Sequence, residues 1–382
     1  MALRRDTQPS GIRAGHVLLI AAAVPAIVLV CSHLFYGNVG ADGWMGFDFR
    51  NGIVRGARHM LDGRSPYELS YIRAHVADAP AGASFPAYPA PGTLIGIPFL
   101  AFPAAVANVL IVALLLPVPA VAMRLLGASD WRCYALAYSS LPTISALELG
   151  TVTPLVLLGV AMAWRFGQQA KGGLALGAVI VLKLFPWPLV LVLMAMRRMR
   201  EALLAAVCLG ITAGAWIIVS PSTAREYLDV ARGLAAMQQQ RGLSFVAFGV
   251  DAGLSPSAAR VLMLAVGVGL LGAAMWIATT SHLAAEAYSV GMCAALALTP
   301  IVWNHYFLLC LVPLVLLYPR FSWHWWLAWA VGWFLPAIPG QAPPGATLAL
   351  PLVCAAVLAV AVRRHHASRT AERRSPARHA VA

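Results

Sequence analysis

The stretch Gly172–Met196 reads GGLALGAVIVLKLFPWPLVLVLMAM, and it decides how the chain is expected to fold. It carries one charge, Lys183, and it exceeds the roughly 20 apolar residues that a membrane-spanning helix needs. Basic residues flank it on both sides: Arg165, Lys171, Arg197, Arg198 and Arg200. Because basic loops stay in the cytoplasm, a single span would leave one flank on the wrong side. We therefore expect a hairpin of two short helices that breaks at Phe185–Pro188, where prolines interrupt helical hydrogen bonding.

The whole chain is unusually apolar. Of its 382 residues, 60% are hydrophobic and 11% are charged, whereas soluble domains carry roughly 25% charged residues. We predict an all-α, polytopic membrane bundle of about twelve spans that forms a single domain over residues 1–362. The predicted spans are His16–Tyr36, Ala104–Met123, Cys133–Leu147, Pro154–Phe166, Gly172–Leu184, Phe185–Met196, Ala202–Ser220, Ala258–Ala278, Ala287–Val302, Tyr306–Tyr318, Trp325–Ile338 and Thr347–Val362.

The net charge of +13 does not indicate a nucleic-acid partner, because the distribution of the basic residues agrees with the predicted topology. Basic residues gather in short loops between apolar runs and in the tail after Val362, which is the positive-inside pattern. We therefore expect a multi-pass protein of the plasma (inner) membrane with both termini in the cytoplasm. The run His16–Tyr36 is too long for the apolar core of a signal peptide and is expected to remain as a helix. The basic tail, residues 363–382, is expected to be disordered near the membrane surface.

Two long loops are predicted on the outer face, at about residues 37–103 and 221–257. The first loop contains Asp48–Leu61, whose apolar spacing predicts a short interfacial helix that ends at Gly63. It also contains Pro91–Phe102, which is apolar but too short to span and is expected to dip into the interface. Long loops on one face of a rigid scaffold commonly carry function, so the active site is expected there.

Asp48 is the candidate catalytic residue of the first loop. It lies between Phe47 and Phe49, and partial desolvation by aromatic neighbours raises the affinity of a carboxylate for a proton, which suits a general base. Arg58, on the same predicted helix, suits a phosphate ligand because its guanidinium fork matches phosphate oxygens. The alternative is a purely interfacial helix whose arginines contact lipid headgroups and pair with the aspartate.

Lys183 and His305 are further candidates. An ionisable residue within an apolar stretch indicates a functional site by default, although a lysine can also extend its amine to the interface. His305 follows Asn304 in LTPIVWNHYFLL, at the outer junction of two predicted spans. A single histidine at such a junction is more often structural than catalytic. No metal-binding spacing such as HExxH and no phosphate-binding glycine loop is present, so no metal site and no cofactor are predicted. Dependence on a metal ion stays open.

Four segments resemble glycosyltransferase family 87, the polyprenol-phosphate-dependent mannosyl- and arabinofuranosyltransferases of bacterial envelopes. The first is Asp48-Phe49 followed by ARHMLDGRSPY, and the second is Tyr88-Pro89-Ala90-Pro91. The third is GLALGAVIVLKLFP, which contains Lys183. The fourth is Thr299-Pro300 followed by Trp303-Asn304-His305-Tyr306. Each segment is a weak signal, but their order along most of the chain is specific.

The resemblance implies a C-type glycosyltransferase architecture with its active site on the outer, extracytoplasmic face. It implies a hexose, most simply mannose, moved from a polyprenyl-phosphate donor to a glycolipid or polysaccharide acceptor. In the predicted inverting displacement, Asp48 is the base that deprotonates the acceptor hydroxyl. The donor phosphate and sugar are expected to contact Lys183, His305, Arg58 and Asn304, and the pocket walls are expected to include Tyr67 and Tyr88.

Departures from the family pattern leave other functions open. The family usually shows Gly-Gln-x-Asn where this chain has Gly150-Thr151-Val152-Thr153. The second proline of the family's Tyr-Pro-Pro segment is Ala90 here. A polytopic transporter or lipid flippase is the main alternative, although no inverted repeat typical of transporters is visible. A scaffold subunit that has lost activity is a third possibility. The oligomeric state is not predicted.

Overall fold

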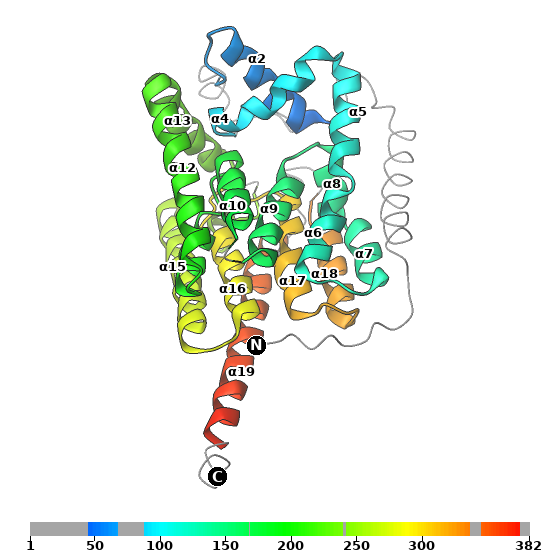
Figure 1. Cartoon of the computed structure of the whole chain (residues 1–382), viewed down its shortest axis with the longest axis vertical. Helices are drawn as coiled ribbons and strands as arrows, with labels where there is room; N and C mark the ends of the chain where they lie inside the picture. Colours follow the sequence, from blue (N-terminus) through cyan, green and yellow to red (C-terminus); the bar gives the residue numbers. More distant parts are fainter. Residues whose placement is uncertain (1–44, 68–87, 168, 240–241, 337–344, 375–382) are drawn as a thin grey trace.

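The computed structural model describes residues 45–67, 88–167, 169–239, 242–336 and 345–374, and the regular secondary structure among them is entirely helical (Figure 1). The predicted first span, His16–Tyr36, lies outside the described residues, as do large parts of the predicted first outer loop and the end of the tail. An all-helical fold is therefore confirmed for the described part of the chain.

The described helices run in the following order: η1 (Phe49–Val54), α2 (Arg55–Leu61), α4 (Ala90–Thr93), η2 (Leu94–Ala101), α5 (Ala104–Leu115), α6 (Val118–Leu126), α7 (Trp131–Tyr138), α8 (Leu141–Glu148), α9 (Thr153–Arg165), α10 (Ala170–Leu182), α11 (Pro188–Ala195), α12 (Met199–Val219), α13 (Pro221–Met237), α14 (Phe245–Asp251), α15 (Pro256–Thr280), α16 (Ala284–Ala297), η3 (Asn304–Cys310), α17 (Leu311–Leu317), α18 (Trp323–Trp333), η4 (Ala346–Leu348) and α19 (Ala349–Arg374). Many begin with proline in their first turn, where the missing N–H has no helical partner to lose.

Fewer helices reach spanning length than the sequence predicts. In the described part of the chain, four helical segments are long and apolar enough to cross a membrane: Ala104–Leu126, Met199–Val219, Pro256–Thr280 and Ala346–Ser368. A fifth is possible if α8 and α9, which meet at a bend of 115°, form one broken span. Most of the other predicted spans within the described residues correspond to shorter helices, so the count of about twelve stays a prediction.

One predicted span, Cys133–Leu147, is wrong as a continuous helix. The helix breaks at Ser139 and Ser140 into α7 and α8. Ser140 has extended backbone (φ −81°, ψ 140°), and Pro142 in the first turn of α8 has no N–H to continue the preceding helix. The break and the bend before α9 turn the Gly150–Thr153 segment inward.

The chain reverses direction between α10 and α11, in agreement with the predicted hairpin. Helix α10 ends at Leu182 and α11 begins at Pro188. After α11, the Arg198 guanidinium donates hydrogen bonds to the carbonyl oxygens of Ala163 (3.3 Å) and Trp164 (3.2 Å), at the end of α9. The chain thus returns to the level at which α10 began, and the basic residues on both sides of the hairpin lie at one end of the bundle.

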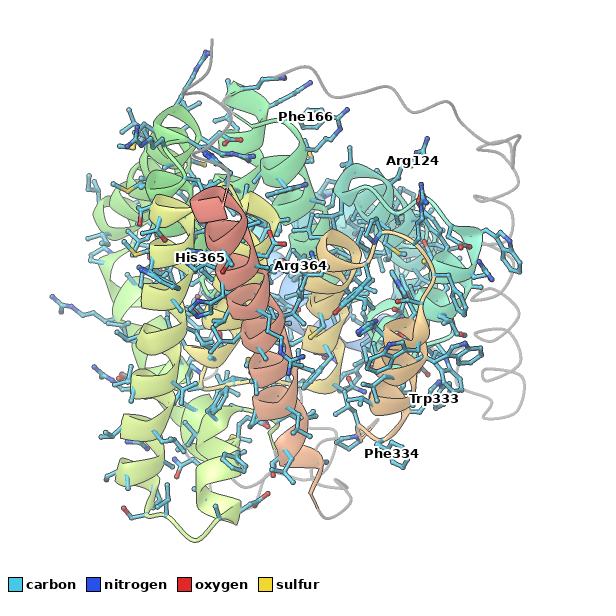
Figure 2. The ribbon with its side chains drawn as sticks, turned by 90° about the horizontal axis from the view of Figure 1, so that it is seen from below. Arg124, Phe166, Trp333, Phe334, Arg364 and His365 are labelled. Atoms are coloured by element: carbon cyan, nitrogen blue, oxygen red, sulfur yellow. The ribbon has the colours of Figure 1, made fainter. Side chains whose placement is uncertain are left out.

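Other basic loops meet at the same end. The Ser129 N–H donates to the Pro319 carbonyl (3.0 Å), and the Arg364 guanidinium donates to the Leu317 carbonyl (3.0 Å). Figure 2 shows the structure from this end, with Arg124 and Arg364 labelled. One end of the bundle is therefore basic, as the positive-inside prediction requires.

The opposite end of the bundle carries the short helices of the predicted first outer loop (Figure 1). The predicted Asp48–Leu61 helix is confirmed as η1 followed by α2, and it ends at Gly63, whose φ is +70°. The predicted Pro91–Phe102 segment is a short helical element, α4 with η2, that stops before Pro103. The predicted second loop is largely helical, because it contains α13 and α14.

The start of the tail differs from the prediction. Helix α19 continues through residues 363–374, which were expected to be disordered. These residues are mostly Ala, Arg, His and Glu with no proline or glycine among them, so they extend the helix that Ala349 begins. The buried end of this extension is fixed by an ion pair of 2.9 Å between Arg364 and Glu286. Residues 375–382 lie outside the described part.

Two glycines allow η1 to lie against the turn between α8 and α9. The Gly46 N–H donates to the Glu148 carbonyl (2.7 Å) and the Asp48 N–H to the Leu149 carbonyl (3.0 Å). At Gly150, φ is +64°, and an added Cβ would lie 3.1 Å from both Gly46 Cα and Phe49 Cβ. The position of Asp48 therefore depends on a close approach that only glycine permits.

Substituting Gly150 is expected to destabilise the fold. Gly150→Ala introduces roughly 1–2 kcal/mol of strain at positive φ and about 1–3 kcal/mol of overpacking against η1. Gly253→Ala is the matched control, because Gly253 also has positive φ (+89°) but no atom within 4 Å of an added Cβ. We expect a larger fall in the thermal unfolding temperature in detergent for Gly150→Ala than for Gly253→Ala. Equal falls would show that the contact with η1 contributes nothing.

Candidate active site

A set of polar side chains meets where several helices begin or end. We call this set the polar cluster, and its members are Asp48, Tyr88, Thr153, Lys183, Asn304, His305 and Tyr306. They come from the start of η1, the segment just before α4, the first residue of α9, the residue after α10 and the start of η3. Segments that are far apart in the sequence thus supply one site.

Lys183 is central to the polar cluster, and its side chain is only 7% exposed. Its Nζ donates one hydrogen bond of 3.4 Å to Thr153 Oγ1. It also lies 3.9 Å from the ring centroid of Tyr306 and 5.8 Å from that of Tyr88, as a cation above aromatic faces. An ammonium group has three N–H donors, and among the described residues only Thr153 accepts from it. The site therefore retains capacity to bind an anion.

Asp48 lies close to this cation. Burial raises the pKa of the Asp48 carboxyl from 3.8 to about 6, while the positive charge of Lys183 acts in the opposite direction. The residue is half-buried, so part of its surface remains open to a reactant. The neighbouring Phe49 ring is fully buried and packs edge-on against Phe99, with centroids 4.7 Å apart. Asp48 is thus held in apolar surroundings that favour proton uptake near neutral pH.

The segment Trp303–His305 contributes buried polar atoms without partners. Asn304 Oδ1 accepts a hydrogen bond of 2.9 Å from Ser145 Oγ, which fixes the orientation of the amide. Among the described residues, Asn304 Nδ2, both ring nitrogens of His305 and Trp303 Nε1 have no hydrogen-bond partner. Buried polar groups are rarely left unsatisfied unless a ligand or water completes them. These atoms therefore have unused capacity to hydrogen-bond a polar ligand or water.

The two predicted pocket tyrosines have different positions. Tyr88 lies in the polar cluster, and its ring fits against Gly52, where an added Cβ would be 2.8 Å from Tyr88 Cε2. Tyr67 lies behind it: its hydroxyl donates to the Tyr88 carbonyl (3.1 Å), and its ring packs near Tyr227 with centroids 5.8 Å apart. Tyr67 therefore supports the position of Tyr88.

The structure does not bring Arg58 into the polar cluster. Arg58 is exposed on α2, and its role in donor binding stays a prediction. Thr153 and Tyr306, by contrast, contact Lys183 directly but have no role predicted from the sequence. A signal for Thr153 was present, because it stands in the segment that departs from the family pattern. No group of three or more His, Cys, Asp or Glu residues in the described part is placed to hold a metal ion.

An apolar groove adjoins the polar cluster on one side. It has a volume of about 420 Å³ and is lined by α4, α10, α12 and α13. Val181 and Leu184, on either side of Lys183, contribute to its wall, as does Pro89 next to Tyr88. Arg225 of α13 lines it and is exposed. Because α12 is a candidate span with many exposed apolar side chains, we expect this groove, which we call the α12 groove, to open toward the bilayer.

Comparison with known proteins identifies the family. The model of glycosyltransferase family 87 matches residues 85–300, which is more than half of the chain. The matched range includes Tyr88, Thr153 and Lys183 and ends just before Asn304. No curated protein and no solved structure matches the chain. The match covers three of the seven residues of the polar cluster and more than half of the chain, and the chain therefore belongs to glycosyltransferase family 87.

Proposed function

We propose that this membrane glycosyltransferase moves a hexose from a polyprenyl-phosphate donor to an envelope acceptor by a single inverting displacement. The observation that carries the proposal is the pairing of a half-buried carboxylate, Asp48, with a buried ammonium, Lys183, beside the α12 groove. A base, a phosphate-binding cation and an apolar channel are the three parts that such a reaction needs. Mannose as the sugar rests on the family resemblance.

The donor fits the α12 groove and its polar end. A polyprenyl chain is apolar and flexible, so it can lie along the α12 groove between α10 and α12. Its phosphate then lies at Lys183, whose wall neighbours Val181 and Leu184 line the same groove. His305 lies close enough to Lys183 to interact with its charge, and we propose that it contacts the phosphate or the sugar. Arg225 is an additional cation at the groove.

The proposed chemistry begins with the acceptor. Asp48 takes the proton of the acceptor hydroxyl, and the oxygen forms a bond to the anomeric carbon while the bond from that carbon to the phosphate oxygen breaks. The configuration at the anomeric carbon inverts, and polyprenyl phosphate leaves with one more negative charge on its phosphate. Lys183 stabilises this charge in a site where the rings of Tyr88 and Tyr306 exclude water. Asn304 Nδ2 is available for a sugar hydroxyl.

The outer face is proposed as the side of reaction. The polar cluster lies toward the end of the bundle that carries η1, α2 and α4, and the basic loops lie at the other end (Figure 1). Since basic loops favour the cytoplasm, the polar cluster is expected to face the outside of a plasma membrane. On that side, the donor would be in the membrane and the acceptor would be part of the cell envelope.

Asp48→Asn is the direct test of the base. We expect the turnover number to fall by roughly 100-fold or more, because general-base catalysis contributes about 10²–10⁴-fold. The assay uses labelled polyprenyl-phosphate mannose as the donor and a glycolipid as the acceptor, and it measures the release of polyprenyl phosphate. Asp62→Asn is the control, because Asp62 lies at the exposed end of α2 and pairs with Arg64. Full activity in a folded Asp48→Asn protein would show that Asp48 is not the base.

The pH profile should report the raised pKa of Asp48. A base must be deprotonated to act, so kcat/KM is expected to rise about tenfold per pH unit below pH 6 and to level off above the pKa of about 6. The residual activity of Asp48→Asn should lack this rise. A wild-type profile that stays flat down to pH 4, near the usual pKa of an aspartate, would contradict a buried, desolvated base.

Lys183→Met is expected to weaken phosphate binding. Charge-assisted hydrogen bonds contribute about 1.5–3 kcal/mol, so affinity for the product polyprenyl phosphate should fall roughly 10- to 100-fold. Its inhibition constant in the transfer assay measures this affinity. Lys171→Met is the control, because Lys171 lies over the Phe166 ring at the opposite end of the bundle. An unchanged inhibition constant in Lys183→Met would place the phosphate elsewhere.

A further inference from the structure

The C-terminal end of α13 packs against two segments that supply the polar cluster. Its buried face forms one apolar cluster with Tyr67 and Ala90, and Ile301 packs against that cluster. Ala90 lies two residues after Tyr88, and Ile301 lies three residues before Asn304. Helix α13 also contacts α4, beside which it lies in Figure 1. The α13 residues of this apolar cluster are Val230, Leu234 and Met237.

A backbone hydrogen bond joins the turn after α13 to the segment that carries His305. The Leu243 N–H donates to the Val302 carbonyl over 2.8 Å. Trp303 follows Val302 directly, and its ring centroid lies 5.6 Å from that of His305 and 6.1 Å from that of Tyr306. The turn after α13 is therefore anchored one residue away from a ring that contacts the polar cluster.

Gln238, at the end of α13, has a buried amide oxygen that nothing in the described structure contacts by a hydrogen bond. The residue is 6% exposed, and its Oε1 has no partner among the described residues. The side chain folds over Gly242, because a Cβ built on Gly242 would lie 3.4 Å from this oxygen. Gly242 precedes Leu243, so the oxygen lies close to the hydrogen bond that reaches Val302. A buried acceptor without a donor is unfavourable, and a ligand or water is needed to complete it.

Gln238 Oε1 and Trp303 Nε1 have complementary chemistry. Both atoms are buried and have no partner among the described residues, and their residues flank the same backbone hydrogen bond. An amide oxygen only accepts hydrogen bonds, and an indole N–H only donates them. A hydroxyl group donates to the first and accepts from the second, whereas an ionised phosphate has no proton to give to Gln238. The pair therefore suits a sugar hydroxyl and not the donor phosphate.

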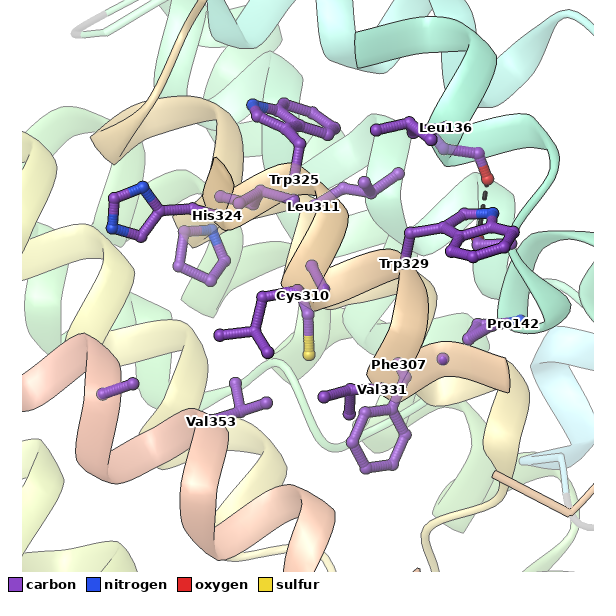
Figure 3. A pocket seen from close by; sticks show the side chains of 18 of the residues that line it. Leu136, Pro142, Phe307, Cys310, Leu311, His324, Trp325, Trp329, Val331 and Val353 are labelled. Atoms are coloured by element: carbon purple, nitrogen blue, oxygen red, sulfur yellow. Dashed lines mark hydrogen bonds between the residues drawn. The ribbon is translucent and has the colours of Figure 1, made fainter. Parts of the chain in front are cut away.

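The indole groups elsewhere in the structure show why Trp303 is unusual. A separate apolar groove between α18 and α19 is lined by Trp325 and Trp329 and by no member of the polar cluster (Figure 3). The Trp325 N–H donates to the Tyr318 carbonyl (3.0 Å), and the Trp329 N–H donates to Ser139 Oγ (3.0 Å). The chain itself satisfies these two indoles, so an unsatisfied indole at Trp303 is a property of the site.

We propose that Gln238 and Trp303 bind one hydroxyl group of the transferred hexose and thereby determine which sugar the enzyme accepts. The inference rests on the proposed function, because it takes the donor lipid to lie in the α12 groove with its phosphate at Lys183. Helix α13 lines that groove through Arg225, so the helix that ends at Gln238 lies on the donor side of the polar cluster. The sugar of the donor then extends from Lys183 toward Trp303.

Donor analogues test the inference with the full chain in lipid nanodiscs. In each analogue of polyprenyl-phosphate mannose, one sugar hydroxyl is replaced by hydrogen or by fluorine, neither of which can donate to Gln238 Oε1. We expect the wild type to lose about tenfold or more in kcat/KM at one position, with both replacements, because a buried acceptor stays unsatisfied. In Gln238→Met, the same analogues should be used about as well as the parent donor. Comparing the two proteins cancels the effect of the replacement on the reactivity of the donor.

Gln239→Met is the matched control, because Gln239 is the next residue and is only half-buried. It should keep the hydroxyl preference of the wild type. A wild type that uses every analogue as well as the parent donor would overturn the inference without any variant. The same preference in Gln238→Met as in the wild type, or equal losses of preference in both variants, would overturn it too.

Thermal unfolding in detergent separates recognition from a structural role. Gln238→Met removes a buried polar atom that has no partner, so its unfolding temperature should equal or exceed that of the wild type. A clear fall in that temperature, with the hydroxyl preference retained, would show that Gln238 supports the fold and does not bind the sugar.

Transfer from the parent donor by the wild type tests the proposed function separately. Release of polyprenyl phosphate with an unaltered hydroxyl preference in Gln238→Met would refute only the role of Gln238. Failure of the wild type to release polyprenyl phosphate from any donor would count against the proposed function and, with it, against the inference.

Discussion

The arrangement of the whole site depends on the burial of one ammonium group beside one carboxylate. Lys183 is 7% exposed, and among the described residues its ammonium has one hydrogen bond, a long one of 3.4 Å to Thr153. Taking a charge out of water is unfavourable unless other groups replace its hydration. Two tyrosine rings and the nearby Asp48 replace part of it, and a phosphate would replace the rest. Without a ligand, the Lys183 ammonium therefore lacks part of its electrostatic stabilisation. Binding of a phosphate ester would supply the missing part.

Helix breaks, not long helices, hold these groups in place. Lys183 directly follows α10 at the reversal, Thr153 begins α9 after the 115° bend, and His305 is the second residue of the short 3-10 segment η3. At such breaks, irregular backbone brings side chains from several segments together, which straight spans cannot do. The close contact of Gly150 with Gly46 has the same role, because it fixes the start of η1 and with it Asp48.

The sequence predicts those features that depend on local charge and apolar patterns. The reversal after Lys183 follows from basic residues on both flanks, and the Asp48–Leu61 helix follows from its apolar spacing. The break of Cys133–Leu147 has a local cause in Pro142, which the predicted span did not take into account. The exposed position of Arg58 could not be predicted, because it depends on packing between segments distant in the chain. Likewise, no pattern indicated that Tyr306 would lie 3.9 Å from the Lys183 ammonium.

The departure at Thr151–Thr153 is compatible with a working site. The Thr153 hydroxyl accepts from Lys183, while its own N–H donates to Thr151 Oγ1 (3.3 Å), so the two threonines form a connected support for the cation. A hydroxyl and an amide oxygen both accept a hydrogen bond from an ammonium group, so a threonine can serve as the acceptor at this position. An inactive scaffold would have no need to keep a lysine buried with its hydration largely removed. The buried lysine, together with the atoms of Asn304 and His305 that have no partner among the described residues, therefore favours an enzyme over a scaffold.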